Sequence, residues 1–476
     1  MPGNQEINYL KKMFYKSLNE EVISTKLLPI SGSNRKYYRL QTANYSVIGT
    51  VNEDIKENEA FVYLAKYFKS LNLPVPDIID VSNDYKYYLQ SDLGNTTLFS
   101  IIENNNFIFT DYIINLYQQA LKYLLLFQTK TNSLDYSKAY PRPVFDKQSI
   151  LWDLYYFKYY FLKLLNITFD EQKLEDDFQL FANILLQADN NFFMYRDFQS
   201  RNIMVNANQL WFIDFQGGRK GALQYDVASL LYDATANIPD SIRENLLSYY
   251  LNELEQISKT KKNEFLKYYN YFVVIRIMQA LGAYGYRGLY QKKPHFIKSI
   301  PYALKNLQKI INCSEKEWEK IPYLYKILLK LFNKYPKDLA ITENYNGKLF
   351  VSIHSFSYRK GIPNDYTGNG GGFVFDCRAL PNPGRYDEYK ELTGLNETIK
   401  KFFENKNEVN KFIANVKEIV MMSVLNYIER GFTNLQICFG CTGGKHRSVY
   451  VAYKIGELLK TLKNIDVKVY HENLID

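Results

Sequence analysis

Apolar and polar residues follow two different patterns along the first part of the chain. Short runs with a strand pattern come early, together with helical spacing that predicts helices over 7–18 and 55–70. Beyond about residue 96 the helical pattern dominates up to Ala188. The strand-like runs cover 22–30, 37–42, 45–51 and two segments on either side of the turn at Asn83-Asp84. This order predicts an α+β bilobal domain, with a small β-rich lobe before a larger helical lobe.

A second change of pattern marks a domain boundary. Ser314 and Glu317 have the spacing of a capping box, and a helical pattern follows over 315–334, which Pro322 kinks or splits. Turn-forming residues and frequent glycines come next, so we place the boundary near 338–347. The predicted parts are a first domain over 1–338, a connector over 339–347 and a smaller α/β domain over 348–476.

Composition narrows the class of protein. The chain has 476 residues, of which 46% are hydrophobic and 23% charged, and these values exclude disorder, collagen and coiled coil as the main state. No apolar run approaches the roughly 20 residues of a membrane-spanning helix, and the first residues do not form a secretory signal. Four cysteines are too few for a disulfide framework, so we expect reduced thiols in the cytoplasm. A net charge of +9 suits a polyanionic partner or a solvated surface equally well.

Three oxygen-bearing side chains have an informative spacing. Asp197 lies in a loop-like stretch, Asn202 follows five residues later, and Asp214 ends the strand-like run 211–213. An aspartate on a tight loop can accept the proton of an attacking hydroxyl, and the other two residues can hold a metal that bridges nucleotide phosphates. Each residue alone is more often a turn residue. The ordered set predicts phosphoryl transfer, with Asp197 catalytic and with Asn202 and Asp214 holding Mg²⁺.

The stretch from Met194 to Gly217 resembles the catalytic loop and metal-binding aspartate of the aminoglycoside phosphotransferase and choline kinase family, relatives of protein kinases. Tyr195 stands where that family usually has histidine, and Tyr225-Asp226 match a block that packs beneath the metal site. The resemblance implies a protein-kinase-like fold, ATP and Mg²⁺ as cofactors, and a small-molecule hydroxyl as acceptor. It also implies nucleotide-binding residues on two upstream segments, at Ser31, Gly32, Ser33, Arg35, Lys36 and Asp92.

One departure concerns the strand-like run 45–51, which has no lysine where most kinases place one to contact the α- and β-phosphates. Glu59 on the next helix is the candidate for the usual glutamate partner of that lysine. The same gap, together with 276–301, resembles the anomeric kinases of N-acetylmuramate and N-acetylglucosamine in cell-wall recycling, which implies an amino-sugar substrate. Basic residues just upstream would then supply the missing charge: Arg35, Lys36 or Arg39.

The segment 433–448 predicts an anion site of another kind. A strand-like run leads into a glycine-rich loop and then into a helix over 448–462. In such a turn, main-chain N–H groups and the positive helix end converge on one point, and Gly443 and Gly444 allow close approach. We therefore expect this loop to bind an anion, most simply a phosphate.

Two sharper interpretations of this loop stay open. Cys441 and Arg447 have the C-x₅-R spacing of cysteine phosphatases, in which a thiolate attacks the phosphorus and the arginine holds the phosphate. Cys438 and Cys441 also form C-x-x-C, which suits redox or zinc chemistry, although no second ligand pair has a suitable spacing for zinc.

Several motifs over about 348–472 resemble the C-terminal domain of the RNase adaptor family RapZ; they lie at 355–363, 373–383, 392–395 and 440–449. In that family the domain binds glucosamine-6-phosphate and, in enterobacteria, a small RNA. RNA is the weaker expectation here, because 469–476 is acidic where the adaptor ends in a basic run. The resemblance implies a cradle for an amino-sugar phosphate, made of His354, Thr442, Gly443, Gly444, His446 and Arg447.

Both halves of the chain thus point to amino-sugar phosphates. The leading prediction is a cytoplasmic, ATP-dependent kinase that phosphorylates a hydroxyl of an amino sugar and has no membrane association, with a C-terminal domain that binds an amino-sugar phosphate. Two alternatives remain: a catalytically weak, nucleotide-binding regulatory or RNA-adaptor protein, and a cysteine phosphatase at Cys441.

Overall fold

The computed structural model describes residues 2–29, 35–258, 261–313, 315–334, 348–363, 365 and 371–474. The chain divides into two compact units. The first contains Met1–Ala283 and Tyr302–Lys334, and the second contains Tyr284–Pro301 and Tyr335–Asp476. The boundary predicted at 338–347 lies wholly outside the described residues.

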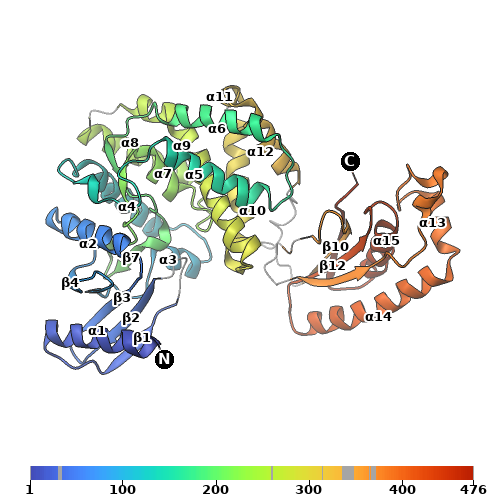
Figure 1. Ribbon diagram of the computed structural model, residues 1–476, viewed down its shortest axis with the longest axis horizontal. Helices are drawn as coiled ribbons and strands as arrows, with labels where there is room; N and C mark the ends of the chain where they lie inside the picture. Colours follow the sequence, from blue (N-terminus) through green and yellow to red (C-terminus); the bar gives the residue numbers. More distant parts are fainter. Residues whose placement is uncertain are drawn as a thin grey trace. The chain divides into compact units, whose positions relative to one another are not determined.

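The first unit begins with a small lobe built on an antiparallel sheet of strand order β1-β2-β3-β5-β4 (Figure 1). Helix α1 (Pro2–Leu18) packs on this sheet, and α2 (Ile55–Ser70) follows the third strand. The Asp54 side chain caps α2 by accepting a hydrogen bond from the Glu57 N–H at 3.1 Å. The strands are β1 (Ser24–Leu27), β2 (Lys36–Gln41), β3 (Ser46–Val51), β4 (Ile78–Val81) and β5 (Tyr87–Ser91).

Strand alternation decides which side chains of this sheet meet α1. Leu40 and Val47 belong to the buried cluster that α1 forms with the sheet. A Cβ at Gly49 would lie 2.9 Å from Leu10 Cδ1, so β3 approaches α1 too closely for a side chain there. Tyr37 and Thr50 pair across β2 and β3 and, one position out of phase, point to the other face.

The larger lobe of the first unit is helical, and α4 packs with α8, α5 with α6, and α6 with α12 (Figure 1). Thr97 forms a capping box at the start of α3, and Thr110 caps α4. The helices are α3 (Leu98–Asn104), α4 (Asp111–Thr129), α5 (Lys147–Phe157), α6 (Glu171–Leu185), α7 (Leu223–Leu231), α8 (Asp240–Ile257), α9 (Lys262–Tyr284), α10 (Pro294–Cys313), α11 (Glu315–Trp318) and α12 (Pro322–Lys334). The last residue of α9 and the part of α10 up to Pro301 belong to the second unit.

Two short antiparallel pairs, β6 with β9 and β7 with β8, lie within the helical lobe. The loop after β6 carries Asp197, and the loop after β8 carries Asp214. Strand pairing thus positions the two loops that the sequence singles out. The strands are β6 (Phe192–Met194), β7 (Ile203–Asn206), β8 (Gln209–Phe212) and β9 (Arg219–Gly221).

The second unit contains a fully parallel sheet of strand order β11-β12-β10-β13. The connection from β10 passes to β11 beyond β12, whereas the connection from β12 passes through α15 to β13 beyond β10. The elements are β10 (Leu349–Ser357), β11 (Gly372–Asp376), α13 (Glu397–Glu404), α14 (Asn407–Glu429), β12 (Asn434–Cys441), α15 (Arg447–Lys460) and β13 (Ile465–His471).

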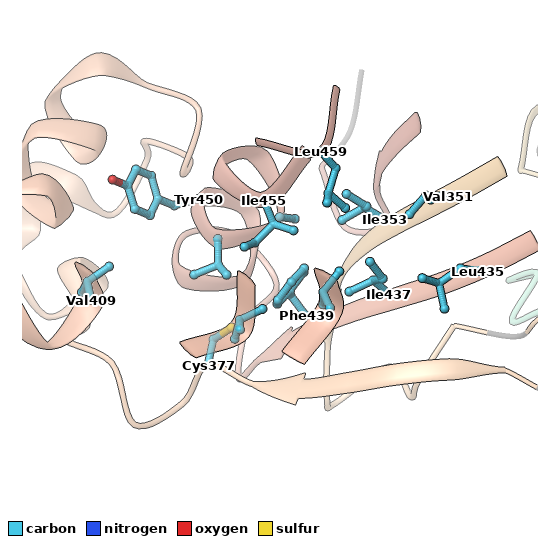
Figure 2. Packing of buried hydrophobic residues seen from close by; sticks show 14 of the residues in the cluster. Val351, Ile353, Cys377, Val409, Leu435, Ile437, Phe439, Tyr450, Ile455 and Leu459 are labelled. Atoms are coloured by element: carbon cyan, nitrogen blue, oxygen red, sulfur yellow. The ribbon is translucent and has the colours of Figure 1, made fainter. Parts of the chain in front are cut away.

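The core of this unit forms between one face of the sheet and the helices (Figure 2). Alternate residues of β10 and β12, including Ile353 and Ile437, are fully buried against α15 residues such as Ile455. Val416 of α14 belongs to the same cluster. The even-numbered residues of β10 therefore occupy the other face of the sheet.

Most predicted elements are confirmed. The helix predicted over 55–70 has the bounds of α2, the helix predicted over 448–462 is α15, and Pro322 splits the helical pattern of 315–334 into α11 and α12. Ser314 of the predicted capping box lies outside the described residues. In the described part of the chain, no helix combines the length and the apolar character that crossing a bilayer requires.

Close packing of α9 against α5 generates a stability prediction. A Cβ at Gly282 would lie 2.9 Å from the Phe157 N atom and from the Tyr156 carbonyl carbon. Gly282→Ala should therefore destabilise the first unit by about 1–3 kcal/mol through overpacking, although alanine stabilises an open helix site by about 1 kcal/mol. Thermal unfolding followed by circular dichroism measures the effect, and an unchanged or higher Tm would contradict the close packing.

Candidate functional site

The loop after β6 is held by a buried carboxylate. Asp226 of α7 accepts main-chain hydrogen bonds from the N–H groups of Tyr195 at 2.7 Å and Arg196 at 2.9 Å. Burial raises the pKa of Asp226 to about 7, although the two hydrogen bonds act to lower it. Arg196 has a φ of 83°, a conformation that persists only where its surroundings hold it. Asp226 thereby fixes the main chain directly before Asp197.

Tyr195 connects this loop to the loop after β8. Its side chain is buried, and its hydroxyl donates to the Ile213 carbonyl at 2.7 Å. Its ring lies edge-on to Phe198 at 5.0 Å and to Phe215 at 6.1 Å between centroids. Phe215 in turn stacks on Phe61 of α2 at 4.9 Å. An aromatic column thus joins both loops to the helix of the small lobe.

The structure brings Asp197, Asn202 and Asp214 together. The Asn202 Nδ2 donates to the Asp197 carbonyl at 2.9 Å and to Asp214 Oδ2 at 3.2 Å. Gln216 Nε2 donates to Asp214 Oδ1 at 2.8 Å. Among the residues that the structure describes, no hydrogen bond or ion pair engages the half-buried Asp197 carboxylate. That carboxylate is therefore available to a hydroxyl group from outside the protein.

Asp214 is suited to hold a cation. Its φ of 68° lies in the left-handed region, which aspartate tolerates better than most residues. Burial raises the pKa of Asp214, and the negative charge of Asp197 raises it further, so the two carboxylates lack positive charge. Because Nδ2 of Asn202 is used, its Oδ1 and the Asp214 carboxylate form an oxygen donor set that fits Mg²⁺. No group of three or more His, Cys, Asp or Glu side chains among the described residues could hold a metal, so a cation here would need further oxygen ligands from other groups.

Arg35 is a buried cation whose charge acts on Asp214, beside a strand β3 that has no lysine. Arg35, directly before β2, is buried, and its Nη2 forms an ion pair with Glu57 Oε2 of α2 at 2.9 Å. Its Nη1 donates to the Tyr37 hydroxyl at 3.2 Å, and its charge acts on Asp214. The prediction of Glu59 as the helix partner is wrong, because Glu59 is exposed and Glu57 is the residue of α2 that reaches the cation.

The other predicted cations and Asp92 are engaged within the protein. Lys36 Nζ pairs with Glu6 of α1 at 2.8 Å, on the opposite face of β2 from Arg35. Asp92 Oδ1 accepts a hydrogen bond from Arg39 Nη2 at 2.8 Å, and Arg39 also donates to the Gly94 carbonyl, so both side chains brace the segment after β5. The structure therefore does not bring Lys36 to the Asp214 side of the sheet, and the carboxylate of Asp92 is not free.

The predicted phosphate loop is described only at its end. Ser31, Gly32 and Ser33 lie outside the described residues, and their contact with a nucleotide stays a prediction. Arg35 is the first described residue after them, and β2 begins at Lys36. The predicted loop is therefore followed at once by Arg35, the buried cation directly before β2.

A further charged cluster, which the sequence analysis missed, lies beside Asp197. Both oxygens of Asp153 accept from Arg196, at 2.6 and 2.8 Å, and the Tyr225 hydroxyl lies 2.6 Å from the same guanidinium. Arg219, the first residue of β9, is also buried there. Asp153 lies on α5, far from the motif in the chain, so no spacing links it to the loop. The only signal for Arg219 is its place five residues after Asp214.

The predicted cradle of the second unit lies where the connections of two neighbouring parallel strands leave in opposite directions. Such a switch point at the carboxyl ends of strands is the usual ligand site of an open α/β sheet. Ser357 at the end of β10 donates through Oγ to the Thr442 carbonyl at 2.6 Å, which ties the two strand ends together. Thr442 and Gly443 are exposed. This turn is the accessible part of the loop.

A thiol occupies the inner part of the loop. Cys441 Sγ accepts from the Gly444 N–H at 3.2 Å and lies 3.1 Å from Ser448 Oγ. Burial acts to raise the pKa of Cys441, but the hydrogen bonds from Ser448 and Gly444 and the charge of Arg447 outweigh it, and the pKa is lowered. Gly444 has a φ of 66°, and a Cβ there would lie 2.4 Å from Asn473 Oδ1. The loop is therefore closely fitted around the sulfur.

The remaining predicted cradle residues, His446 and Arg447, both donate hydrogen bonds to main-chain carbonyl groups. His446 Nε2 donates to the Tyr389 carbonyl at 3.0 Å, and burial lowers the pKa of His446, so the ring is neutral near pH 7. Arg447 Nη1 donates to the carbonyls of Arg378 and Leu380 at 2.7 and 3.3 Å. Both side chains therefore fasten neighbouring segments to the loop.

The structure does not bring His354 to the cradle. His354 Nδ1 lies 2.8 Å from Glu472 Oε1, and its ring stacks on Tyr470 at 4.9 Å. Ser355 and Ser357, on the opposite face of β10, are the residues whose side chains point toward the loop side. Strand alternation is the physical reason for this correction.

Two family models match the chain. Residues 25–259 match the phosphotransferase enzyme family, and residues 349–475 match the RapZ C-terminal domain. The first range includes Asp197, Asn202 and Asp214 with their supporting residues. The second includes the whole parallel sheet with the loop at Cys441.

Curated relatives match over a limited length. A nucleotide-binding protein of Thermotoga neapolitana is 39% identical over 117 residues, which are 25% of this chain and 40% of that protein. A nucleotide-binding protein of Koribacter versatilis is 36% identical over 126 residues, 26% of this chain and 39% of that protein. The chain thus spans about 40% of the length of the curated relatives it matches.

Solved structures with a similar fold are distant in sequence. A thermostable mutant of an aminoglycoside phosphotransferase is 13% identical, with a TM-score of 0.43, over 64% of this chain and 99% of that one. An ethanolamine kinase of Plasmodium vivax is 16% identical, with a TM-score of 0.44, over 64% of this chain and 86% of that one.

The family matches and the geometry agree on the character of each unit. The first combines a β-rich lobe, a helical lobe and a loop pair that gathers Asp197, Asn202 and Asp214. Residues 25–259 thus match the phosphotransferase enzyme family, and residues 349–475 match the RapZ C-terminal domain.

Proposed function

We propose that the protein is a kinase that transfers the γ-phosphate of ATP to a hydroxyl of an N-acetylated amino sugar, with Mg²⁺ as cofactor. The observation that carries the proposal is the partner-free carboxylate of Asp197 beside the Asn202–Asp214 pair. The buried Arg35–Glu57 ion pair supports it, because phosphoryl transfer needs a fixed cation near the phosphates. The amino-sugar class rests on the resemblance of 276–301 to the anomeric kinases of amino sugars.

In this proposal Asp197 orients the acceptor hydroxyl and accepts its proton as the oxygen attacks the γ-phosphorus. The bond from that phosphorus to the bridging oxygen breaks, and ADP leaves with the electron pair. Asn202 and Asp214 hold the Mg²⁺, which neutralises charge on the phosphates when bound. Arg35 contributes a positive charge that Glu57 and burial hold in place, so little reorganisation is needed.

For the second unit we propose that the exposed turn at Thr442 and Gly443 binds the phosphate of an amino-sugar phosphate. Its position at the switch point of the parallel sheet supports this assignment, and α15 presents a helix N-terminus whose cap residue His446 makes no side-chain capping bond. We favour binding over hydrolysis because Cys441 is only 2% exposed and Arg447 is turned to main-chain carbonyls.

A direct assay of the purified full chain tests the kinase proposal. ADP release is measured with ATP, Mg²⁺ and, in separate reactions, N-acetylmuramate, N-acetylglucosamine, choline and an aminoglycoside. We expect turnover with at least one amino sugar and none with choline. Turnover of choline alone would contradict the amino-sugar class, and failure with every acceptor would favour the regulatory alternative.

Asp197→Asn should lower kcat by about 10²–10⁴-fold, because the amide cannot accept the proton of the hydroxyl. Nucleotide binding, measured by calorimetry, should persist, since Asn202 and Asp214 remain. The matched control is Asp176→Asn, which changes an exposed carboxylate on α6 and should leave kcat unchanged. Full activity of Asp197→Asn would remove the residue from the mechanism.

Arg35→Gln should raise KM for ATP and reduce kcat/KM by about 10–100-fold, the cost of a charge-assisted contact to phosphate. Lys36→Gln is a strong control, because the adjacent cation faces α1 and Glu6 instead. We expect Lys36→Gln to affect kcat/KM by less than about twofold. If the two variants behaved alike, Arg35 would have no special role in nucleotide binding.

Gly444→Ala should abolish binding of glucosamine-6-phosphate to the second unit, because its Cβ would displace Asn473 and the end of β10. Gly431→Ala is the matched control: its φ of 68° resembles the 66° of Gly444, but no atom lies within 4 Å of its Cβ. Both variants carry the same conformational cost, so only Gly444→Ala should lose the calorimetric signal. Equal binding by both would place the ligand elsewhere.

A further inference from the structure

The segment 130–146, between α4 and α5, contacts both lobes of the first unit. Both neighbouring helices belong to the helical lobe, yet the short 3₁₀ turn of this segment, Tyr136–Lys138, packs against α2 of the small lobe. Val144 then forms a bridge with Lys220 of β9, the strand that pairs with β6. The segment therefore runs from the helix that carries Glu57 to the strand pair that leads to Asp197. No step of the mechanism described so far involves it.

Hydrogen bonds fasten this segment to α2 and to the N-cap residue of α2. A partly buried one runs from the Tyr140 hydroxyl to Asp54 Oδ2 at 2.8 Å. Two more are exposed and join the hydroxyls of Tyr63 and Tyr67 on α2 to the segment, at 2.9 Å each. A partly buried hydrogen bond to a carboxylate is stronger than an exposed neutral one, so Tyr140 makes the main contact with the small lobe.

Asp54 connects Tyr140 to the ion pair of the nucleotide side. Its Oδ2 accepts from Tyr140, while its Oδ1 accepts from the Glu57 N–H at 3.1 Å and so caps α2. Glu57, on the first turn of α2, forms the ion pair with Arg35 at 2.9 Å. The hydrogen bond to Asp54, together with burial and the charge of Glu57, raises the pKa of Tyr140, so the hydroxyl is a protonated donor near pH 7. Tyr140 thus holds the helical turn that carries the partner of Arg35.

The other end of the segment is attached to the loop of Asp197. The Phe145 N–H donates to the Lys220 carbonyl at 2.8 Å, and the Lys220 N–H donates to the Pro143 carbonyl at 2.9 Å. The guanidinium carbon of Arg196 lies 5.2 Å from the centre of the Phe145 ring, and Arg196 directly precedes Asp197 in the chain. This end is therefore anchored through both the main chain and a side chain.

These contacts join the two halves of the proposed site. Arg35 belongs to the small lobe, whereas the loops after β6 and β8 belong to the helical lobe. Four residues separate Tyr140 from Phe145, so little slack remains between the two attachment points. The contact of Phe61 with Phe215 also joins the lobes, but stacked rings can slide, whereas a hydrogen bond fixes both distance and direction. The segment therefore determines how the start of α2 is oriented against the two loops.

We propose that Tyr140 is a positioning residue for phosphoryl transfer, because its hydrogen bond to Asp54 sets the place of the Arg35–Glu57 ion pair relative to the loop of Asp197. The inference rests on the proposed kinase function. Tyr140 acts through the start of α2 and takes no part in the chemistry itself. Phosphoryl transfer depends on the placement of the reacting groups, and a misplacement of about 1 Å can cost about 10²-fold in rate. Without this hydrogen bond, Arg35 would meet the phosphates less often in the right position.

Tyr140→Phe, which removes the hydroxyl and keeps the ring, tests this proposal. The full-length variant should bind the ATP analogue AMP-PNP with Mg²⁺ about 3–10-fold more weakly than the wild-type protein in calorimetry, the effect of one lost hydrogen bond. The matched control is Tyr155→Phe, which removes a bond of the same kind, from the Tyr155 hydroxyl to Glu175 Oε1 at 2.7 Å. That bond joins α5 to α6 within the helical lobe, so its loss should leave the affinity unchanged. Equal affinity of Tyr140→Phe and the wild-type protein would overturn the proposal.

A double-mutant cycle separates positioning from a general loss of stability. Arg35→Gln removes the cation through which Tyr140 acts, so adding Tyr140→Phe to it should weaken AMP-PNP binding no further. Additive losses would mean that Tyr140 does not act through Arg35, contrary to the proposal. If Tyr140→Phe folds poorly, Tyr63→Phe decides: it removes an exposed contact of the same segment, and an unchanged affinity would contradict the positioning role.

The outcomes also distinguish this inference from the proposed function on which it rests. Turnover of no acceptor by the wild-type protein would refute the kinase function, yet the affinities of the variants for AMP-PNP could still be compared. Turnover by the wild-type protein, combined with equal AMP-PNP affinities for the wild-type protein and Tyr140→Phe, would refute only the role of Tyr140.

Discussion

One buried carboxylate organises the phosphotransferase domain. Asp226 accepts the main-chain N–H groups of Tyr195 and Arg196, and this fixes the direction in which the next residue, Asp197, leaves the strand. A carboxylate in this position costs desolvation energy, which the two hydrogen bonds offset. The Tyr195 hydroxyl then carries the constraint to the Ile213 carbonyl, directly before the metal-side aspartate. The two loops are therefore joined by hydrogen bonds, and the geometry of the site depends on Asp226 and on the Tyr195 hydroxyl as well as on the three motif residues.

The site is electrostatically incomplete without its ligands. The charge of Asp197 acts to raise the pKa of Asp214, and the buried Arg35, with its partner Glu57, acts to lower it. In the proposed mechanism, a nucleotide with its metal would balance these charges. Preorganised charges of this kind stabilise a transition state because the protein has already met the cost of assembling them during folding. The same arrangement explains why a neighbouring strand can supply the cation that β3 lacks: the position of the charge matters, and its place in the sequence does not.

The sequence analysis predicted the parts of this protein that local patterns determine. Helix α2, the split at Pro322 and the grouping of Asp197, Asn202 and Asp214 follow from spacing, because each depends on residues close in the chain. Contacts between side chains of different elements were harder to predict. Glu57 was missed in favour of Glu59, since only the rotation of α2 against β2 decides which glutamate reaches Arg35. Asp153 was not predicted at all, because a contact over a long sequence separation leaves no periodicity. His354 was predicted at the loop, but strand alternation places it on the other face of β10, beside Glu472.

The two domains offer different kinds of group to an anion, and this difference affects whether each is suited to catalysis or to binding. The phosphotransferase domain uses buried side-chain cations and carboxylates, which bind strongly and can transfer protons. The RapZ C-terminal domain offers main-chain groups at a strand-to-helix turn, and its inner donors, from Gly444 and Ser448, are already taken by the Cys441 sulfur. A turn of that kind with no free base beside it is suited to recognise a phosphate and release it unchanged. Under the proposed function, chemistry and recognition would reside in separate domains, and a phosphorylated product of the first would be a ligand of the class proposed for the second.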